Sequence, residues 1–303
     1  MNCKLILAPM ADYTDYPFRE ICRKFGAQYT FTEMISVDSI IMNNPKIHKM
    51  LPQKNEKNIG IQLFGNDPIK FVKAAKELEK LASWIDINAA CPVNKVVKKG
   101  AGAALLDTPE LLANIIYTLK SSVKIPVGVK IRLGFNKTNI EEIIQLIEAA
   151  GANYIIIHGR TRNQFYSGKA DKTIIKKIKE MVSIPVGASG DVFSQGDVEE
   201  YLTTYNADFV LVARGAIGNP WIFLNSEYEP SVEERKKVCL EHLKLSIDFY
   251  ENETYAVKKF RKILIKYFTG VEGVTEIKRR TSSLHSYEEV NNLLNEIFSK
   301  NKV

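Results

Sequence analysis

The sequence predicts a (β/α)8 barrel followed by a small domain that is entirely helical. Eight short apolar runs recur through the first two thirds of the 303-residue chain, and helical patterns with a period near 3.6 residues separate most of them. Strands that alternate with helices indicate a parallel sheet, and eight such units indicate that the sheet closes. No strand-like run follows Ser231, which predicts the separate helical domain.

The expected strands span residues 5–10, 29–35, 59–64, 84–88, 126–132, 154–159, 185–188 and 209–213. The expected barrel helices span 69–81, 109–120, 140–150, 172–181 and 197–204. Pro68 and Pro109 each follow a capping residue, Asp67 or Thr108, as is typical of a helix start. An open doubly wound sheet also alternates strands and helices. Eight well-spaced units without an early GxGxxG turn favour the barrel.

The C-terminal part contains four helical patterns, at 232–251, 254–268, 274–282 and 287–298, and residues 225–230 are expected to form a linker. We therefore place a barrel domain at residues 1–230 and a helical domain at 231–303.

Composition narrows the class of protein. The net charge of +7 gives a mild preference for acidic partners. The four cysteines form no CxxC pair and the four histidines form no HxH or HExxH pattern, so we expect neither a disulfide framework nor a metal site. The short apolar run before Pro9 is too brief for a signal peptide or a membrane span, and a reducing cytoplasm is the expected location. The cysteines are Cys3, Cys22, Cys91 and Cys239.

The segment after the fourth strand is the most informative. Cys91 lies at the carboxyl end of a barrel strand, where catalytic residues of this fold gather. A single cysteine is more often a small core residue, but its polar neighbours favour a functional role. Nearby glycines, with Lys95, Lys98 and Lys99, suit a polyanionic ligand.

The last two strand ends predict a phosphate site. The loops at residues 189–191 (SGD) and 214–220 (RGAIGNP) supply glycines for close backbone approach, and Arg214 supplies a cation. Either loop alone could be a simple turn, but phosphate sites in this fold are often built by the loops after strands seven and eight.

Two further polar residues follow the barrel pattern. Lys130 lies inside an apolar strand, on the same face as Arg132, and needs either a partner or a wet cavity. His158 ends the sixth strand. A lysine that reaches solvent at the rim and a structural histidine are the simpler alternatives.

A series of motifs occurs in order and at barrel spacing. With them the chain resembles, along almost its whole length, the tRNA-dihydrouridine synthases, flavin enzymes that reduce specific uridines in tRNA. The motifs are LAPMADYTD (7–15), QLFG (62–65), DINAACP (86–92), GAGAAL (100–105), VKIRLG (129–134), HGRTR (158–162), SGD (189–191) and RGAIGNPW (214–221).

The resemblance implies an FMN-binding barrel, a helical domain that helps to hold tRNA, and NADPH, or NADH, as the reductant. It implies that Cys91 is the catalytic acid, giving a proton to carbon 5 of the uracil while a hydride from the flavin reaches carbon 6. It places Asn88 and Arg132 among the flavin or substrate contacts. The implied cofactor contacts are Pro9, Met10, Ala11, Gln62, Lys130, His158, Ser189, Gly190, Asp191, Ala213 and Arg214.

The expected tRNA surface is basic. Residues 231–303 contain fourteen Lys or Arg against eleven Asp or Glu, and a cluster that includes Lys258 and Arg261 falls on one helix. A solvated helix face is the simpler reading of such a cluster. Lys95, Lys98 and Lys99 are expected to meet the RNA backbone at the barrel mouth. We expect a monomer.

Three other functions compete with this one. A flavin barrel that acts on a free pyrimidine would share the barrel and the cysteine, but it would need no basic helical domain. A tRNA-binding protein without catalysis would leave Cys91, Lys130 and His158 unexplained. A purely structural role would explain none of the polar strand ends.

Overall fold

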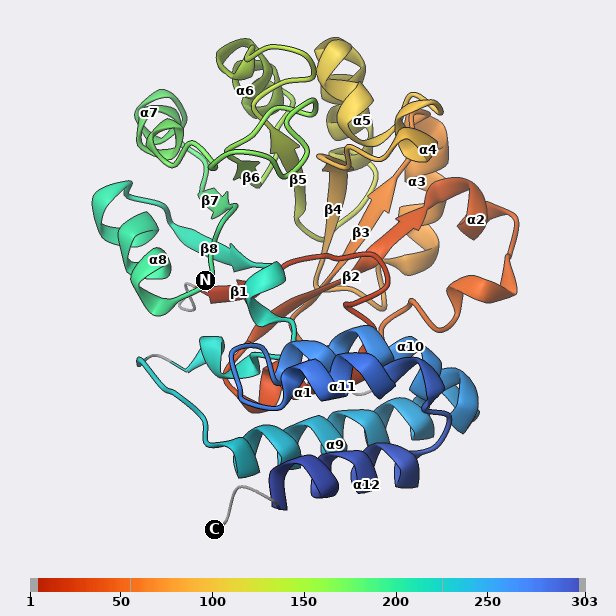
Figure 1. Ribbon diagram of the computed structural model, residues 1–303. Coiled ribbons are helices and arrows are strands. Elements are labelled where there is room, and N and C mark those ends of the chain that lie inside the picture. The colour runs from red at the N-terminus through yellow and green to blue at the C-terminus, as the bar shows by residue number, and fades with distance from the viewer. Residues whose placement is uncertain (1–4, 55, 225, 300–303) are drawn as a thin grey trace. The chain divides into compact units, whose positions relative to one another are not determined.

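The computed structural model describes residues 5–54, 56–224 and 226–299 and contains a closed barrel of eight parallel strands (Figure 1). Each strand pairs with the next along the chain, and the last pairs with the first. The predicted (β/α)8 barrel is therefore confirmed. The strands are β1 (Leu5–Leu7), β2 (Tyr29–Ser36), β3 (Ile59–Phe64), β4 (Trp84–Ala89), β5 (Val127–Arg132), β6 (Tyr154–His158), β7 (Val186–Ser189) and β8 (Phe209–Val212).

The helices between residues 37 and 199 lie outside these strands in Figure 1. The five predicted barrel helices are present as α3 (Pro68–Leu78), α5 (Pro109–Lys120), α6 (Ile140–Ala149), α7 (Thr173–Met181) and α8 (Gln195–Glu199), the last continued by a π-helical turn at Glu200–Thr204. Three short helices were not predicted: α1 (Tyr16–Lys24), α2 (Val37–Ile41) and α4 (Asn94–Val97).

The predicted helix caps differ in outcome. The carboxylate of Asp67 accepts hydrogen bonds from the backbone N–H groups of Ile69 and Lys70, so it caps α3 as expected. Thr108 occupies the corresponding position before α5, but its side chain makes no capping hydrogen bond.

Aromatic rings fill the amino-terminal end of the barrel interior. Trp84, Tyr154 and Phe209 each begin an even-numbered strand, and each lies opposite a glycine of the preceding strand. A Cβ atom on Gly128, for example, would lie 2.0 Å from the Tyr154 ring. The glycines therefore leave room for the rings, which pack together in a buried cluster that includes Ile6 and Leu211.

Contacts divide the chain into two compact units. The first contains the chain up to Asp15 and Ala27–Arg214, and the second combines Tyr16–Gly26 with the chain from Gly215 onward. The expected boundary between residues 230 and 231 lies inside the second unit, which begins at Gly215 and also includes α1. The ring of Phe18 in α1 stacks on His242, with 5.6 Å between centroids.

The second unit contains the four predicted C-terminal helices. They are α9 (Val232–Tyr250), α10 (Glu253–Tyr267), α11 (Val274–Arg280) and α12 (Tyr287–Ser299). A reciprocal capping box between Ser231 and Glu234 starts α9. None of the described helices is long and apolar enough to cross a lipid bilayer.

The described cysteines are all free thiols. Cys22 and Cys239 are buried, and Cys91 is half-buried. Two residues named above lie outside the described residues: Cys3, and Asn225, the first residue of the expected linker. Within the described ranges, no three His, Cys, Asp or Glu side chains are grouped so that they could hold a metal ion.

Candidate active site

Buried polar side chains gather at the carboxyl ends of the barrel strands, as predicted. Six consecutive strands, β2 to β7, contribute them. Charged groups buried at this density need partners or a ligand, so the ring of strand ends is the candidate site. Its buried members include Glu33, Gln62, Asp86, Asn88, Lys130, Arg132, His158 and Ser189.

The turn that carries Cys91 is held from both sides. The amide oxygen of Asn88 accepts hydrogen bonds from the N–H groups of Ala90 and Cys91, at 3.1 and 2.9 Å. The Cys91 carbonyl accepts a hydrogen bond from Ala103. Gly102 has a positive φ of 61°, and a Cβ there would lie 2.9 Å from the Cys91 carbonyl oxygen. The backbone at Cys91 is therefore held in one defined conformation.

The Cys91 thiol stays protonated at neutral pH. Burial raises its pKa above the ordinary value, and a hydrogen bond from the Val93 backbone and the charges of Arg132 and Lys130 oppose this only in part. A half-buried, protonated thiol at the barrel mouth can act as a proton donor.

A chain of hydrogen bonds leads from a buried carboxylate to this turn. Asp86 accepts hydrogen bonds from Gln62 Nε2, at 2.7 Å, and from the Tyr154 hydroxyl, at 2.9 Å. Because an ionised carboxylate only accepts, Gln62 turns its amide oxygen toward Asn88 Nδ2, 2.7 Å away. The Asn88 oxygen is then left for the Cys91 turn. Asn88 thus shapes the turn, a role that the sequence analysis did not assign.

Burial raises the pKa of Asp86 to about 6, with the hydrogen bonds from Gln62 and Tyr154 and the charge of Lys130 opposing it. Asp86 and Tyr154 were not among the residues predicted from the sequence. Strand alternation places Asp86 on the same face as Asn88, which was the available signal.

Lys130 is buried on β5, and its ammonium group makes no hydrogen bond or ion pair with the described residues. Burial lowers its pKa to about 8, helped by Arg132 and opposed by Asp86 and Cys91. The group is therefore mostly cationic at neutral pH. A buried cation without an acceptor fits an electron-rich or anionic ligand in the barrel mouth.

Arg132 connects the Cys91 turn to the loop after β6. Its Nε donates to the Ala90 carbonyl at 2.8 Å, and its Nη1 donates to the carbonyls of Thr161 and Phe165. Burial lowers the pKa of Arg132 to about 10, so the guanidinium remains charged at neutral pH. Arg132 therefore positions two loops while it adds positive charge beside the thiol.

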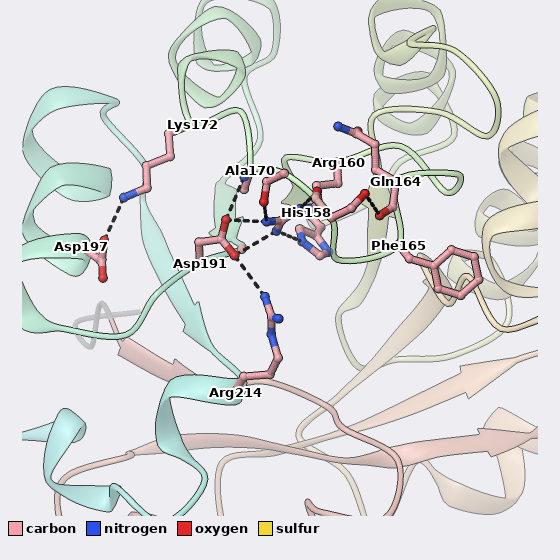
Figure 2. A network of polar contacts seen from close by, with 12 residues as sticks. His158, Arg160, Gln164, Phe165, Ala170, Lys172, Asp191, Asp197 and Arg214 are labelled. Carbon is pink, nitrogen blue, oxygen red and sulfur yellow. Dashed lines mark hydrogen bonds and ion pairs between the residues drawn. The ribbon is translucent and has the colours of Figure 1, made fainter. Parts of the chain in front are cut away.

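Asp191 is the centre of an ion-pair network (Figure 2). Its two oxygens accept hydrogen bonds from Arg160 at 3.0 and 2.6 Å, and Oδ1 also accepts one from Arg214 at 3.0 Å. The N–H of Ala170 donates to Oδ2. Burial alone would raise the pKa of Asp191, but these donors lower it below the ordinary value.

This network brings the two predicted phosphate loops together. Ser189 pairs in register with Leu211, and Arg214 bridges from the loop after β8 to Asp191 in the loop after β7. Gly190 has a positive φ of 118°, and a Cβ there would lie 2.8 Å from the His158 ring. The pairing of Asp191 with Arg160 was not predicted, because 31 positions separate these two residues in the sequence.

Arg160 also determines which ring nitrogen of His158 carries the proton. Its Nη1 lies 3.3 Å from His158 Nε2, and a guanidinium can only donate. Nε2 is therefore the acceptor, and the proton of the neutral ring is on Nδ1. Burial and four surrounding cations lower the pKa of His158 well below its ordinary value, so the ring stays neutral. Among the described residues Nδ1–H has no hydrogen-bond partner, which leaves it available to a ligand.

The remaining predicted residues lie farther from this network or in the other unit. Pro9, Met10 and Ala11 form the turn after β1, where the Thr14 hydroxyl accepts from the Met10 N–H. In the second unit Lys258 is exposed on α10, whereas Arg261 donates twice to the Leu284 carbonyl. The assigned ligand contacts remain predictions. Three exposed lysines lie in α4 or directly after it: Lys95, Lys98 and Lys99.

Comparison with known proteins identifies the family. The family model described as dihydrouridine synthase matches residues 6–302. The chain belongs to the dihydrouridine synthase family. The tRNA-dihydrouridine synthase B of Pasteurella multocida (strain Pm70) is 38% identical over 282 residues, which cover 89% of this chain and 85% of that protein. A probable tRNA-dihydrouridine synthase of Aquifex aeolicus (strain VF5) is 36% identical over 292 residues, or 92% of each chain.

These matches confirm the family resemblance that the motifs predicted. Among solved structures, histamine dehydrogenase from Rhizobium sp. 4-9 superposes on this dihydrouridine synthase with a TM-score of 0.59 and 14% identity. The superposition covers 83% of this chain and 51% of that one, and it shows a shared fold.

Proposed function

We propose that this dihydrouridine synthase reduces uridine to 5,6-dihydrouridine in tRNA, with FMN as its cofactor and NADPH, or NADH, as the reductant. One observation carries the proposal: a fixed, protonated thiol shares a ring of strand ends with two polar groups, Lys130 Nζ and His158 Nδ1–H, that lack partners in the described chain. A cytoplasmic location follows from a tRNA substrate. That the protein acts as a monomer remains a prediction.

The residues present fit a flavin mononucleotide. Lys130 and His158 would contact the polar edge of the ring, where a cation stabilises negative charge on the reduced form. The loops Ser189–Asp191 and Ala213–Arg214 would hold the phosphate, because they combine a glycine backbone with a guanidinium. The backbone of Pro9–Ala11 and the free donor of Gln62 are the other proposed contacts.

The reaction needs a hydride and a proton. FMN held at this site would supply hydride chemistry for carbon 6 of the uracil, with NADPH as its reductant. Cys91 donates its thiol proton to carbon 5, and Arg132 and Lys130 stabilise the thiolate that remains. The target uridine must leave its stack to reach the barrel mouth.

The proposal is tested by incubating the purified protein with NADPH and unmodified tRNA and locating dihydrouridine by nucleotide mass mapping. Site-specific dihydrouridine is the expected product. A yellow protein that oxidises NADPH but leaves tRNA unchanged would contradict the proposal and favour a free pyrimidine as substrate.

Lys130 predicts how flavin affinity depends on pH. Its ammonium is present below about pH 8 and is lost above it, so FMN should bind more weakly as the pH rises through that value. Lys130→Met should weaken binding by about tenfold to a hundredfold at neutral pH, since a hydrogen bond to a charged group contributes about 1.5–3 kcal/mol. The measurement is fluorescence titration of apoprotein with FMN across this range.

Lys130→Met should also lose the pH dependence, whereas Lys73→Met, at an exposed position of α3, should keep it. An equal slope in wild type and Lys130→Met would exclude Lys130 as the titrating group.

The exposed lysines of α10 predict a salt-dependent contribution to tRNA binding. Charge reversal at Lys258 and Lys266 should weaken tRNA binding and reduce the slope of log affinity against log salt by about one for each phosphate that is no longer neutralised. Arg261 is left unchanged because its bonds to Leu284 support the fold of the helical unit.

The matched control reverses the exposed lysines Lys73 and Lys76 of α3. Filter binding at several salt concentrations measures both variants. The α10 assignment would be wrong if the two double variants bound tRNA equally well at every salt concentration.

A further inference from the structure

A row of alternating guanidinium and aromatic groups leads from the Cys91 turn toward solvent. Arg132, which is bonded to the Ala90 carbonyl, has its Cζ 5.6 Å from the centroid of the Tyr166 ring. The same ring lies 4.7 Å from Arg214 Cζ, which in turn lies 5.4 Å from the Phe193 ring. We call Arg132, Tyr166, Arg214 and Phe193 the rim stack.

The outer rings of the rim stack face solvent. Arg132 is 1% exposed, whereas Tyr166 is 54% and Phe193 is 51% exposed. The rings come from the loops after β6 and β7, and Arg214 between them follows β8. Large aromatic rings exposed together beside cations are unusual on a surface with no partner.

The rim stack is held rigidly although it is exposed. Arg132 donates to the carbonyl of Phe165, just before Tyr166, and Arg160 donates to those of Ser167 and Gly168, just after it. Asp191 holds Arg214, as Figure 2 shows. On the other side, the N–H of Phe193 donates to Asp197. Such preorganisation lowers the entropic cost of binding a partner.

The chemistry of the rim stack matches single-stranded nucleic acid. Bases stack on aromatic faces, and guanidinium groups attract the phosphodiester. Two carboxylates bonded to the stack are already paired: Asp191 with Arg160 and Arg214, and Asp197, which accepts from the Phe193 N–H, with Lys172. The loop after β6, which carries Tyr166, also carries Arg162. The Arg162 guanidinium lies over the rings of Phe135 and Phe165 and adds positive charge to this loop. The positive charge suits both RNA and an acidic peptide. The exposed rings favour RNA, because bases stack on them.

We propose that Tyr166 and Phe193 bind unpaired nucleotides next to the target uridine by stacking with their bases. This inference rests on the proposed function. An enzyme that takes a base out of its stack leaves the neighbouring bases without stacking partners, and the rim stack replaces those partners beside the Cys91 turn.

The test compares Tyr166→Ala, Phe193→Ala and the double variant with Tyr166→Phe, which keeps the ring. Tyr117→Ala, which removes a 63% exposed tyrosine from α5, is the matched control. Three quantities are measured: flavin reduction by NADPH without RNA, kcat and KM for tRNA, and fluorescence quenching of a single-stranded RNA oligonucleotide containing 2-aminopurine.

Each ring removed should raise the KM for tRNA by about tenfold and abolish part of the 2-aminopurine quenching. The rate of flavin reduction by NADPH and the kcat should stay unchanged, and Tyr166→Phe and Tyr117→Ala should behave as wild type. All variants should keep the yellow colour, because Tyr166 and Phe193 are not among the proposed flavin contacts.

Unchanged tRNA KM and unchanged quenching in the double variant would overturn the proposal. A slower reaction with NADPH at an unchanged tRNA KM would overturn it too and would assign the rings to the reductant. If the wild type reduces no tRNA uridine, the proposed function fails. Quenching of the 2-aminopurine oligonucleotide then tests by itself whether the rim stack binds bases.

Discussion

Replacing Cys91 with alanine is expected to abolish reduction of tRNA uridines while the protein still binds flavin and accepts electrons from NADPH. The hydrogen bonds that hold this turn involve backbone groups and Asn88, so the alanine variant should keep its geometry. Loss of a positioned general acid slows a reaction by about 10²–10⁴-fold. Anaerobic flavin spectra and mass mapping of dihydrouridine measure the two half-reactions separately.

The matched control is Cys239→Ala, which removes a buried thiol from the helical unit. It should lower stability slightly and keep turnover. In the wild type the raised pKa keeps Cys91 protonated, so the acid function should be lost only above the ordinary titration range of a thiol. Full turnover by Cys91→Ala would show that another group donates the proton.

The substitution Asp191→Asn is expected to lower the free energy of unfolding by about 3 kcal/mol and to weaken FMN binding. The Arg160 side chain is 2% exposed and would lose the carboxylate that neutralises it. Asparagine tolerates the positive φ of 49° at this position, so the effect reports the lost charge rather than backbone strain. Urea unfolding and FMN titration measure the two effects.

The pH dependence of that loss has a defined sign. The pKa of Asp191 is lowered in the folded protein, so its stabilising contribution is present above the unfolded value of about 3.9 and is lost as the pH falls through the folded value. The difference between wild type and Asp191→Asn should therefore shrink in acid. Asp38→Asn, which breaks the exposed pair with Lys70, should cost less than about 1 kcal/mol. If Asp191→Asn and Asp38→Asn lowered the free energy of unfolding equally, the stabilising role assigned to the Arg160–Asp191 ion pair would be refuted.

Much of the barrel could be predicted from local patterns, and the misses have physical reasons. The helix α1 is nine residues long and packs on α9, so its own sequence carries no signal of the unit to which it belongs. The first strand was expected at 5–10, but pairing ends at Leu7, and the chain then turns through Met10, whose carbonyl accepts from Tyr13 and Thr14. The predicted cap Thr108 makes no side-chain hydrogen bond, because side-chain geometry is not set by residue type.

The sequence by itself determined the closed barrel, the helical segment after it, the family, and which strand ends carry Cys91, Lys130, His158 and the two glycine loops. Each of these depends on periodicity or on a short motif, which are properties of neighbouring residues. Only the tertiary structure decided which polar groups meet. Asp86, Gln62 and Asn88 come from two strands, and Arg160 and Asp191 from the loops after two others, yet their hydrogen bonds orient the Cys91 turn and His158. Such pairings follow from strand register and barrel closure, because these bring distant residues to hydrogen-bond distance.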